Sequence, residues 1–463
     1  MRRPLVYLLF ILGAAFIVLP ILNAHPTLQL GIDVLEQSDF SLLKGKKIGI
    51  LTHNAARNSH NIPTYEVLYR SPIKDQIVCF LTPEHGLLGQ YAAGEHISEQ
   101  QQWNGIPVFS LYDNQGQPPL LSPTKKQLSN IDVLVIDLVD IGARCYTYIT
   151  CMRFALEQCI RYGKQVVILD RPNPLGRKVS GPMMAQNLQS YVGGYCIPFL
   201  HGMTMGELAT MLIHAYQPNP WLQPLTQEQL AAAAVEIVKM EHYQPDTVWN
   251  QQTWNKPMQW TPPSPNIPTF ESALAYSCFP ILQIGKYLRT ISSAQREHKD
   301  GIPQPFAFLY SPHACHNPYA LCETLNAAQV PGITCEVVRN GTTKGIHLKI
   351  TDWEQFNPGL FVLKLYQADQ QLKAIYPIPF ISYLSLKFWT STPLAHYNIC
   401  WVTKRPSVRY DQAFWKIHIG DPDIIKLVES RLPLTEEYIR VQINSWEKTI
   451  AKFKQQRKAW LLY

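Results

Sequence analysis

Two short, mostly apolar runs that each end in an aspartate constrain the fold most. They are Val133–Asp137 (VLVID) and Gln165–Asp170 (QVVILD). Runs of this length, rich in Val and Ile and without polar alternation, are typical of parallel strands buried on both faces of a sheet. An amphipathic segment with helical spacing, Met152–Tyr162, lies between them. Strand, helix and strand in this order predict an α/β fold with a Rossmann-like, doubly wound parallel sheet.

The length of the chain predicts more than one domain, since 463 residues exceed one ordinary core. Around Trp249–Pro265 the composition changes to Trp, Pro, Gln and Asn, which we interpret as a linker or crossover. We therefore expect the Rossmann-like catalytic domain at 27–260 and a smaller C-terminal α/β domain at 261–463. In the latter, the strand-like segments are Phe306–Tyr310, Thr334–Val338, Ile346–Ile350 and Phe361–Tyr366, and the helical ones are Ala320–Ala328, Tyr376–Tyr383 and the tail from Thr435.

The N-terminus has the pattern of an export segment. Arg2 and Arg3 precede an apolar run from Leu5 to Leu22, as in a signal peptide. Residues 1–24 are therefore assigned to a signal peptide, or to a signal anchor, because the run also has about the length of a minimal membrane span. We expect an exported, periplasmic protein, attached to the inner membrane only where this segment is retained.

Charge and motifs exclude several function classes. The net charge of +7 is spread thinly, and the basic tail Lys448–Arg457 has helical spacing, which favours a solvated helix face over a nucleic-acid patch. The chain has no G-x-G-x-x-G or P-loop motif for a nucleotide. It also lacks a G-x-S-x-G elbow and an H-E-x-x-H zinc motif. We expect no cofactor, no metal ion and no nucleic-acid partner.

The stretch Phe80–Gly89 (FLTPEHGLLG) carries the most specific catalytic signal. A strand-like run, Ile77–Leu81, ends there, and Glu84 and His85 follow it directly. Two glycines then permit a tight turn. Both proton-transfer side chains thus follow the carboxyl end of a buried strand, where ligands bind in open α/β sheets. The alternative is a loop whose glutamate caps the next segment and whose histidine lies at the surface.

Three further polar clusters follow other predicted strands. They are Asp137–Tyr148, Asp170–Gly176 and His201–Ala209. Because the carboxyl ends of parallel strands meet at one edge, we expect these clusters to gather beside Glu84. Such a mixture of carboxylates, His, Arg, Asn and Tyr suits the binding and cleavage of a polar substrate such as a sugar.

A glycosidase needs one carboxylic acid to protonate the leaving oxygen and usually a second carboxylate. Glu84 is the candidate acid or base, with His85 beside it. Asp140 is the candidate second carboxylate. Arg144 is a candidate for bidentate pairing with a carboxylate of the substrate.

Several candidates also have structural interpretations that the sequence leaves open. Asp140 and Arg144 have the spacing of an ion pair. Glu207 stands at the third position of a capping box, T-x-x-E. The rigid prolines around Ser264 and Asn266 either hold these side chains against a ligand or form a stiff loop.

An ordered set of motifs resembles the exo-β-N-acetylmuramidase family, the NamZ or YbbC-like proteins of bacterial cell-wall recycling. In family order they are Gly31–Leu35, Thr82–Gly86 with Ala93–Glu95, Asp140–Tyr148, Asp170–Gly176, Gly181–Pro182, His201–Thr204 with Gly206–Ala209, Pro263–Thr269 and Leu461–Tyr463. The resemblance implies a Rossmann-like catalytic domain whose cleft is completed by a second α/β domain. It implies release of N-acetylmuramic acid from the non-reducing end of peptidoglycan fragments, with Glu84 as the catalytic residue and Arg144 or another cation on the lactyl carboxylate.

The candidate catalytic residues are therefore Glu84, His85 and Asp140. The candidate substrate-binding residues are Asn54, Glu95, Arg144, Tyr146, Tyr148, Arg171, Asn173, His201, Thr204, Glu207, Ser264 and Asn266. The expected partner is a peptidoglycan-derived glycan that contains muramic acid.

The chain departs from the family pattern at three places. Its first loop reads Thr52-His-Asn54 where the family has Thr-Asn-His, and Leu88 replaces an arginine. The region Phe279–Thr290 lacks the family's Glu-Gly-Thr-Asn segment. Two hypotheses follow from this: a divergent glycoside hydrolase of this family, or a non-catalytic cell-wall glycan-binding protein that kept the fold.

Overall fold

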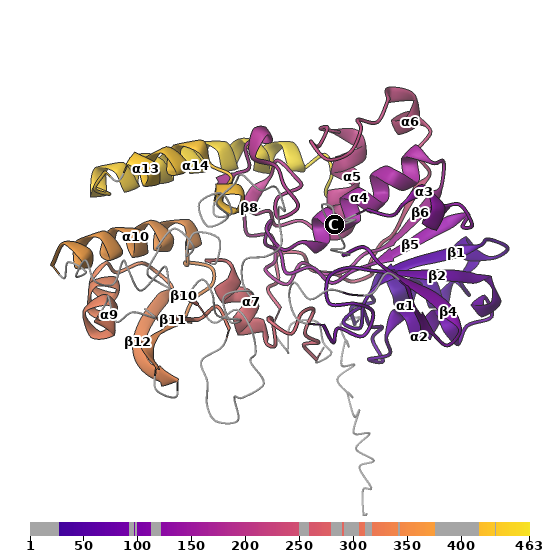
Figure 1. Ribbon diagram of the computed structural model, residues 1–463, viewed down its shortest axis with the longest axis horizontal. Helices are drawn as coiled ribbons and strands as arrows, with labels where there is room; N and C mark the ends of the chain where they lie inside the picture. The colour runs from indigo at the N-terminus through magenta and orange to yellow at the C-terminus, as the bar shows by residue number, and fades with distance from the viewer. Residues whose placement is uncertain are drawn as a thin grey trace, which may run out of the picture.

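The computed structural model describes residues 27–91, 97, 100–112, 122–249, 259–278, 289–290, 305–310, 317–340, 343–375, 416–430 and 432–463. This part of the chain contains a seven-stranded sheet, a four-stranded sheet and a two-stranded ribbon (Figure 1). The seven-stranded sheet and its helices form the Rossmann-like domain, and the four-stranded sheet belongs to the C-terminal domain. The predicted α/β class is confirmed.

The large sheet has the strand order β3-β4-β2-β1-β5-β6-β9. The strands are β1 (Ile48–Thr52), β2 (Ile77–Thr82), β3 (Gln100–Trp103), β4 (Ile106–Ser110), β5 (Val133–Asp137), β6 (Gln165–Leu169) and β9 (Val235–Val238). All pairs are parallel except that of the edge strand β3 with β4. The parallel strands, numbered along the chain, thus follow the order 3-2-1-4-5-6 of dinucleotide-binding folds. The order reverses between β1 and β5, which defines the switch point of the sheet.

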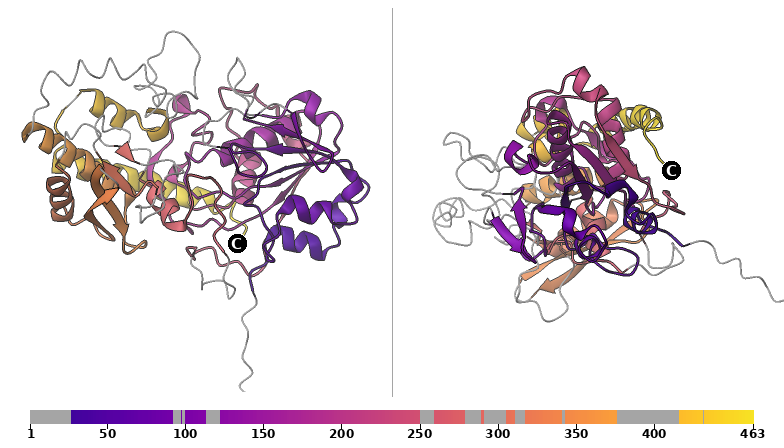
Figure 2. Two further views of the ribbon diagram at one scale, coloured as in Figure 1. Left: turned by 60° about the horizontal axis from the view of Figure 1, so that its bottom comes forward. Right: turned by 90° about the vertical axis from the view of Figure 1, so that its right-hand side faces the viewer.

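Alternate residues of the central strands fill two separate cores. Val133 and Val135 of β5 belong to the core with α1 (Gly31–Gln37) and α2 (Thr64–Tyr69). Leu134 and Ile136 belong to the core with α4 (Tyr148–Arg161) and α5 (Met205–His214). Figure 2 shows helices on both sides of this sheet. Burial on both faces explains why the strands read as unbroken apolar runs.

The remaining elements of this domain are shorter. They are α3 (Lys125–Leu128), β7 (Ser180–Met183), β8 (Pro198–Leu200), α6 (Gln227–Ala231) and α7 (Phe270–Tyr276), with single 3₁₀ turns at Ser41–Leu43, Lys74–Gln76 and Gln186–Leu188. Residues of α7 belong to the same core cluster as residues of α4 and α5, although they follow the domain boundary placed at residue 260.

The C-terminal domain packs helices against an antiparallel sheet of order β10-β11-β13-β12. Its elements are β10 (Arg289–Thr290), β11 (Phe308–Tyr310), α9 (Pro318–Ala327), β12 (Ile333–Asn340), β13 (Thr343–Ile350), α10 (Pro358–Ile375), α13 (Pro422–Ser430) and α14 (Glu436–Arg457). The expected strands near 306–310, 334–338 and 346–350 are therefore confirmed. The expected helix 376–383 lies outside the described residues.

The prediction of a strand at Phe361–Tyr366 is wrong, because this run lies inside α10. Phe361, Val362, Leu363 and Leu365 are all buried. A helix that is covered on most sides loses its amphipathic period, so its sequence resembles that of a buried strand.

Helix α14 joins the two domains. It runs from the C-terminal domain back to the Rossmann-like domain, where the chain ends (Figure 1). Trp446 belongs to the core of the C-terminal domain and Phe453 to that of the Rossmann-like domain. At its end, Arg457 donates to the carbonyl oxygens of His201 and Gly202, both at 2.8 Å.

Within the described part of the chain, no helix combines the length and apolarity needed to cross a membrane. The predicted signal peptide or anchor, 1–24, lies outside these residues.

Candidate active site

Glu84 lies just beyond the carboxyl end of β2, in a tight turn. His85 and Gly86 both take positive φ angles, 77° and 75°, and a Cβ on Gly86 would come within 2.9 Å of the Tyr91 ring. The Nδ1 atom of His85 lies 2.8 Å from the Tyr91 carbonyl oxygen. Because a carbonyl only accepts, Nδ1 carries the proton. His85 therefore closes the turn that presents the half-buried Glu84.

The N-terminus of α4 meets this turn. The Thr147 hydroxyl lies 3.4 Å from Oε2 of Glu84. The Tyr148 hydroxyl lies 3.0 Å from the Glu84 carbonyl oxygen and 2.9 Å from that of Pro263. One phenol thus connects the Glu84 turn to the proline-rich loop.

Tyr112, which follows β4, also contacts Glu84. Burial, together with the charge of Glu84 and a hydrogen bond with it, raises the pKa of Tyr112 well above its usual value.

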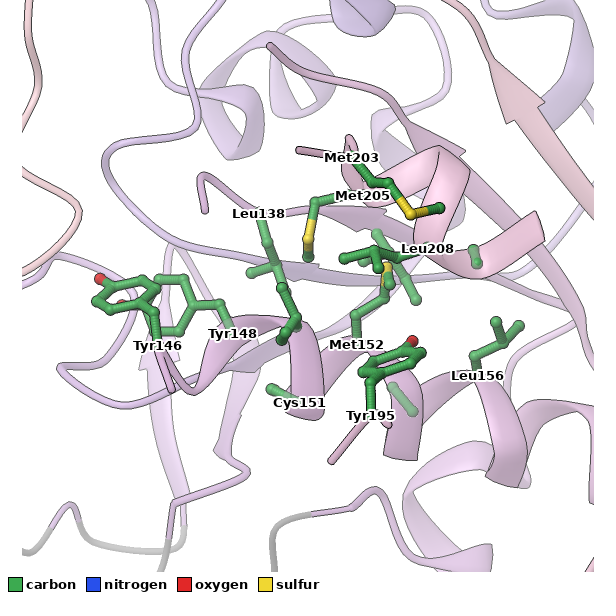
Figure 3. Packing of buried hydrophobic residues seen from close by; sticks show 14 of the residues in the cluster. Leu138, Tyr146, Tyr148, Cys151, Met152, Leu156, Tyr195, Met203, Met205 and Leu208 are labelled. Carbon is green, nitrogen blue, oxygen red and sulfur yellow. The ribbon is translucent and has the colours of Figure 1, made fainter. Parts of the chain in front are cut away.

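A cluster of tyrosines lies near both Glu84 and Asp140. The ring of Tyr146 lies 4.7 Å from that of Tyr148 and 6.1 Å from that of Tyr276, and Figure 3 shows the first pair side by side at the end of the core cluster. Burial raises the pKa of Tyr146 and Tyr276, and the charges of Glu84 and Asp140 add to this effect at both. Both carboxylates therefore flank one pair of phenols, which stay protonated and able to donate.

Asp140 follows β5, and one hydrogen bond holds its side chain. Its Oδ2 accepts the Gly142 N–H at 2.8 Å and lies 3.6 Å from Nε2 of His201. Nδ1 of His201 accepts the Met203 N–H at 3.2 Å, so the proton of the neutral ring is on Nε2 and faces Asp140. Oδ1 of Asp140 is buried and has no hydrogen-bond partner among the described residues. A donor on a ligand would satisfy it.

His53, at the end of β1, is a buried neutral histidine. Its Nε2 accepts the Val139 N–H at 3.0 Å, and its ring lies edge-on to Tyr148 at 4.9 Å. Burial lowers its pKa to about 3, and the positive charges of Arg171 and His85 act in the same direction. The histidine of the altered first loop is therefore fixed between β1 and β5.

The structure gives Arg144 a different role from the predicted one. Its guanidinium is fully buried. It donates to the carbonyl oxygens of Pro182, Ile197, His418 and Ile419, at 2.8–2.9 Å. The ion pair with Asp140 that the sequence left open does not form, because these four carbonyls occupy the terminal nitrogens. The same contacts leave no approach for the carboxylate of a substrate.

Other predicted binding residues are also used inside the protein. Arg171 pairs through two nitrogens with Asp137, which ends β5. The Asn173 side chain closes a turn by donating to the Met203 carbonyl at 3.1 Å and accepting the Leu175 N–H at 2.9 Å. The polar atoms of both side chains are therefore engaged by partners within the protein.

Thr204 and Glu207 form the capping box of α5 that the sequence left open as a structural interpretation. Thr204 also donates to Oδ2 of Asp170 at 2.7 Å. The Glu207 carboxylate is fully buried and pairs with both terminal nitrogens of Arg177, at 2.5 and 2.7 Å. Both side chains therefore hold the helix in place.

The remaining predicted residues bond within the protein, lie at the surface or fall outside the described residues. Asn54 accepts from Arg57 at 2.8 Å and from the Tyr65 hydroxyl at 3.3 Å. Ser264 accepts the N–H of the half-buried Asn266 at 3.0 Å, which stiffens the proline-rich loop. Glu95 lies outside the described residues, as do positions 279–288 of the divergent region. Leu88 is 47% exposed on the turn after Glu84.

Sequence reasoning missed four residues around Glu84 and Asp140. They are His53, Tyr112, Tyr191 and Tyr276. His53 and Tyr112 end or follow parallel strands, so the strand-end rule that selected Glu84 applies to them as well. Tyr191 comes from an irregular loop and Tyr276 from α7, and no local pattern marks either one.

Two carboxylates among protonated phenols and neutral histidines, at the switch-point edge of a Rossmann-like sheet, define the class of a glycosidase. Family models for the exo-β-N-acetylmuramidase NamZ match the chain, the N-terminal one at residues 48–271 and the C-terminal one at 300–463. The chain belongs to this family of β-N-acetylmuramidase-like glycosidases.

Individual relatives agree with this assignment. The chain is 32% identical over 362 residues to the peptidoglycan beta-N-acetylmuramidase NamZ of Bacillus subtilis (strain 168), covering 74% of this chain and 79% of that protein. A crystal structure of a DUF1343 family protein from Bacteroides fragilis NCTC 9343 has a TM-score of 0.71 and 25% identity, covering 94% of this chain and 99% of that one. A second protein of that family and strain, with a TM-score of 0.56 and 21% identity over 95% of this chain and 99% of its own, shares the fold.

Proposed function

We propose that this protein is an exo-acting β-N-acetylmuramidase that releases N-acetylmuramic acid from the non-reducing end of peptidoglycan fragments. The observation that carries the proposal is the position of Glu84, presented by a tight turn beside Thr147 and Tyr148. The named activity of the Bacillus subtilis relative supports the substrate class. A non-catalytic glycan-binding role is not favoured by this family membership.

Glu84 is the proton donor to the leaving oxygen in this proposal, because it is the partly exposed carboxylate of the pair. Asp140 is the second carboxylate, and the Gly142 N–H holds its Oδ2. Burial keeps the phenols of Tyr112 and Tyr146 protonated, and the Tyr112 hydroxyl hydrogen-bonds to Glu84.

We also propose that the protein is exported, on the basis of the apolar run Leu5–Leu22 behind Arg2 and Arg3. A fusion of residues 1–30 to a reporter enzyme that is active only outside the cytoplasm tests this. Loss of reporter activity when Leu12 is replaced by Arg is expected, and an inactive unaltered fusion would contradict export.

The substitution Glu84→Gln tests the catalytic proposal. The amide keeps the shape of the side chain but transfers no proton, so kcat for a chromogenic β-N-acetylmuramic acid glycoside should fall by roughly 10²- to 10⁴-fold. Glu66→Gln, an equal change on α2 with the side chain 30% exposed, is the matched control and should keep full activity. Near-normal turnover by folded Glu84→Gln would remove Glu84 from the catalytic role.

A further inference from the structure

A separate pocket of about 200 Å³ lies at the switch point of the sheet. The loop after β1 lines it with Ala55, Arg57 and Asn58, and the loop after β5 with Val139 and Asp140. Arg171, Pro172, Trp249 and Trp260 complete most of the wall. Glu84 is not among the lining residues, so the pocket adjoins the carboxylate site through Asp140.

Two tryptophans from the segment of unusual composition form the aromatic wall of the pocket. Trp249 and Trp260 pack edge to face, with ring centroids 5.4 Å apart and planes at 87°. The Trp249 N–H donates to the Pro174 carbonyl at 2.8 Å, and Nε1 of Trp260 donates to that of Ile267 at 3.1 Å. Aromatic faces fixed in this way, next to a few polar groups, suit the apolar face of a sugar ring.

The two arginines of the pocket differ in their charge balance. Arg171 is neutralised by Asp137. Arg57 donates only to uncharged oxygens, the Asn54 carbonyl at 3.0 Å, the Asn54 side chain at 2.8 Å and the Asn61 carbonyl at 2.9 Å. In the described part of the chain, Arg57 makes no ion pair. Each of its terminal nitrogens keeps a second N–H for a ligand.

The nearby carboxylates do not compensate Arg57. Asp33 accepts the N–H groups of Leu30 and Ser59, both at 2.8 Å, and Glu36 accepts from Asn58 at 2.9 Å. Asp140 faces His201. Arg57 is therefore a positive charge on the pocket wall that no carboxylate of the described residues balances at contact distance, and it is available to an anion.

We infer that this pocket binds the N-acetylmuramic acid ring, with the lactyl carboxylate on Arg57 and the ring against Trp260. The inference rests on the proposed function and deepens it, because it assigns the residue that distinguishes muramic acid from N-acetylglucosamine. A chain of contacts connects the pocket wall to Glu84: Val139 donates to His53, which packs on Tyr148, whose hydroxyl contacts the Glu84 carbonyl.

Equilibrium binding of the free monosaccharides tests the inference without requiring hydrolysis. Titration calorimetry should show that the unaltered full chain binds N-acetylmuramic acid at least tenfold more tightly than N-acetylglucosamine, which lacks the lactyl group. Raising the salt concentration should weaken binding of the acid only, because ions screen the attraction to Arg57. Binding of neither sugar, or of both equally, would overturn the inference, even if Glu84-dependent hydrolysis is observed.

Substitutions of Arg57 separate charge from loop structure. Arg57→Gln should abolish the preference by weakening N-acetylmuramic acid binding roughly tenfold while N-acetylglucosamine binding stays unchanged. Arg57→Lys keeps the charge and should retain part of the preference. Arg70→Gln, which removes an exposed arginine paired with Glu66, is the matched control and should bind as the unaltered chain does. A full preference in folded Arg57→Gln, or an equal loss of both sugars in both Arg57 variants, would overturn the assignment.

Discussion

At the residue scale, two of the histidines near the carboxylates, His53 and His201, accept hydrogen bonds from the backbone. His53 accepts the Val139 N–H and His201 accepts the Met203 N–H, each through one ring nitrogen. A ring nitrogen that accepts such a bond carries no proton, so each histidine has a fixed tautomer. Each of these bonds fixes the orientation of its ring, and the proposed proton transfer involves Glu84 and Asp140.

The lowered pKa of His53 predicts a loss of stability in acid. The unfolded chain takes up a proton near pH 6.5, whereas the folded chain does so only near pH 3. Between these values the unfolded state binds more protons, so falling pH favours unfolding. From pH 7 to pH 5 this group should cost about 2 kcal/mol of unfolding free energy.

The variant His53→Gln isolates this effect, because a glutamine oxygen accepts the Val139 N–H but does not titrate. Urea unfolding at pH 7 and pH 5 should show a drop that is smaller by about 2 kcal/mol than in the unaltered chain. His60→Gln, which removes an exposed histidine, serves as the control and should leave the drop unchanged. Equal drops in the His53 variant and the unaltered chain would show that His53 is not buried as a neutral ring.

At the scale of the element, the sequence predicts those features that are determined by the residues of a single strand, helix or turn. The apolar runs of β2, β5 and β6 and the turn carrying Glu84 follow from residue type and spacing. The run Phe361–Tyr366 was misassigned because burial on most sides hides the helical period. Arg144 and Tyr191 were misread or missed because their environment comes from distant segments, which local patterns do not encode.

Glu207 offers a test of structural against substrate-binding roles at this scale. Its carboxylate accepts from Arg177, from the Thr204 N–H at 2.9 Å and from the Leu462 N–H at 3.0 Å. In Glu207→Gln an NH₂ group replaces one carboxylate oxygen and would face the N–H groups that this oxygen now accepts. The unfolding free energy should therefore fall by about 3 kcal/mol.

Denaturation and steady-state kinetics on the same sample distinguish the two roles of Glu207. The folded fraction of Glu207→Gln should keep its KM for the muramic acid glycoside. Glu228→Gln in the exposed helix α6 should change neither stability nor KM. A raised KM at unaltered stability would instead place Glu207 in contact with the substrate.

At the scale of the whole molecule, the two domains are joined by buried polar contacts as well as by α14. Arg144 lies after β5 in the Rossmann-like domain, yet two of its four acceptors, His418 and Ile419, precede α13. Ile419 belongs to the core of the C-terminal domain. The guanidinium thus fixes the position of that core relative to the sheet edge that carries Asp140.

Replacing Arg144 by Met should loosen this junction. The methionine fills much of the volume but leaves four buried carbonyl oxygens without their donor, which should lower the unfolding free energy by about 3 kcal/mol or more. Because the variant loses the hydrogen bonds that cross from Arg144 to His418 and Ile419, limited proteolysis should cut between the domains faster. Arg161→Met, which removes a bond to the Gln223 carbonyl inside one domain, is the control and should not change the cleavage pattern. Unaltered stability and cleavage with a raised KM for the muramic acid glycoside would mean that Arg144 reaches the substrate, as the sequence predicts, and that the junction does not depend on it.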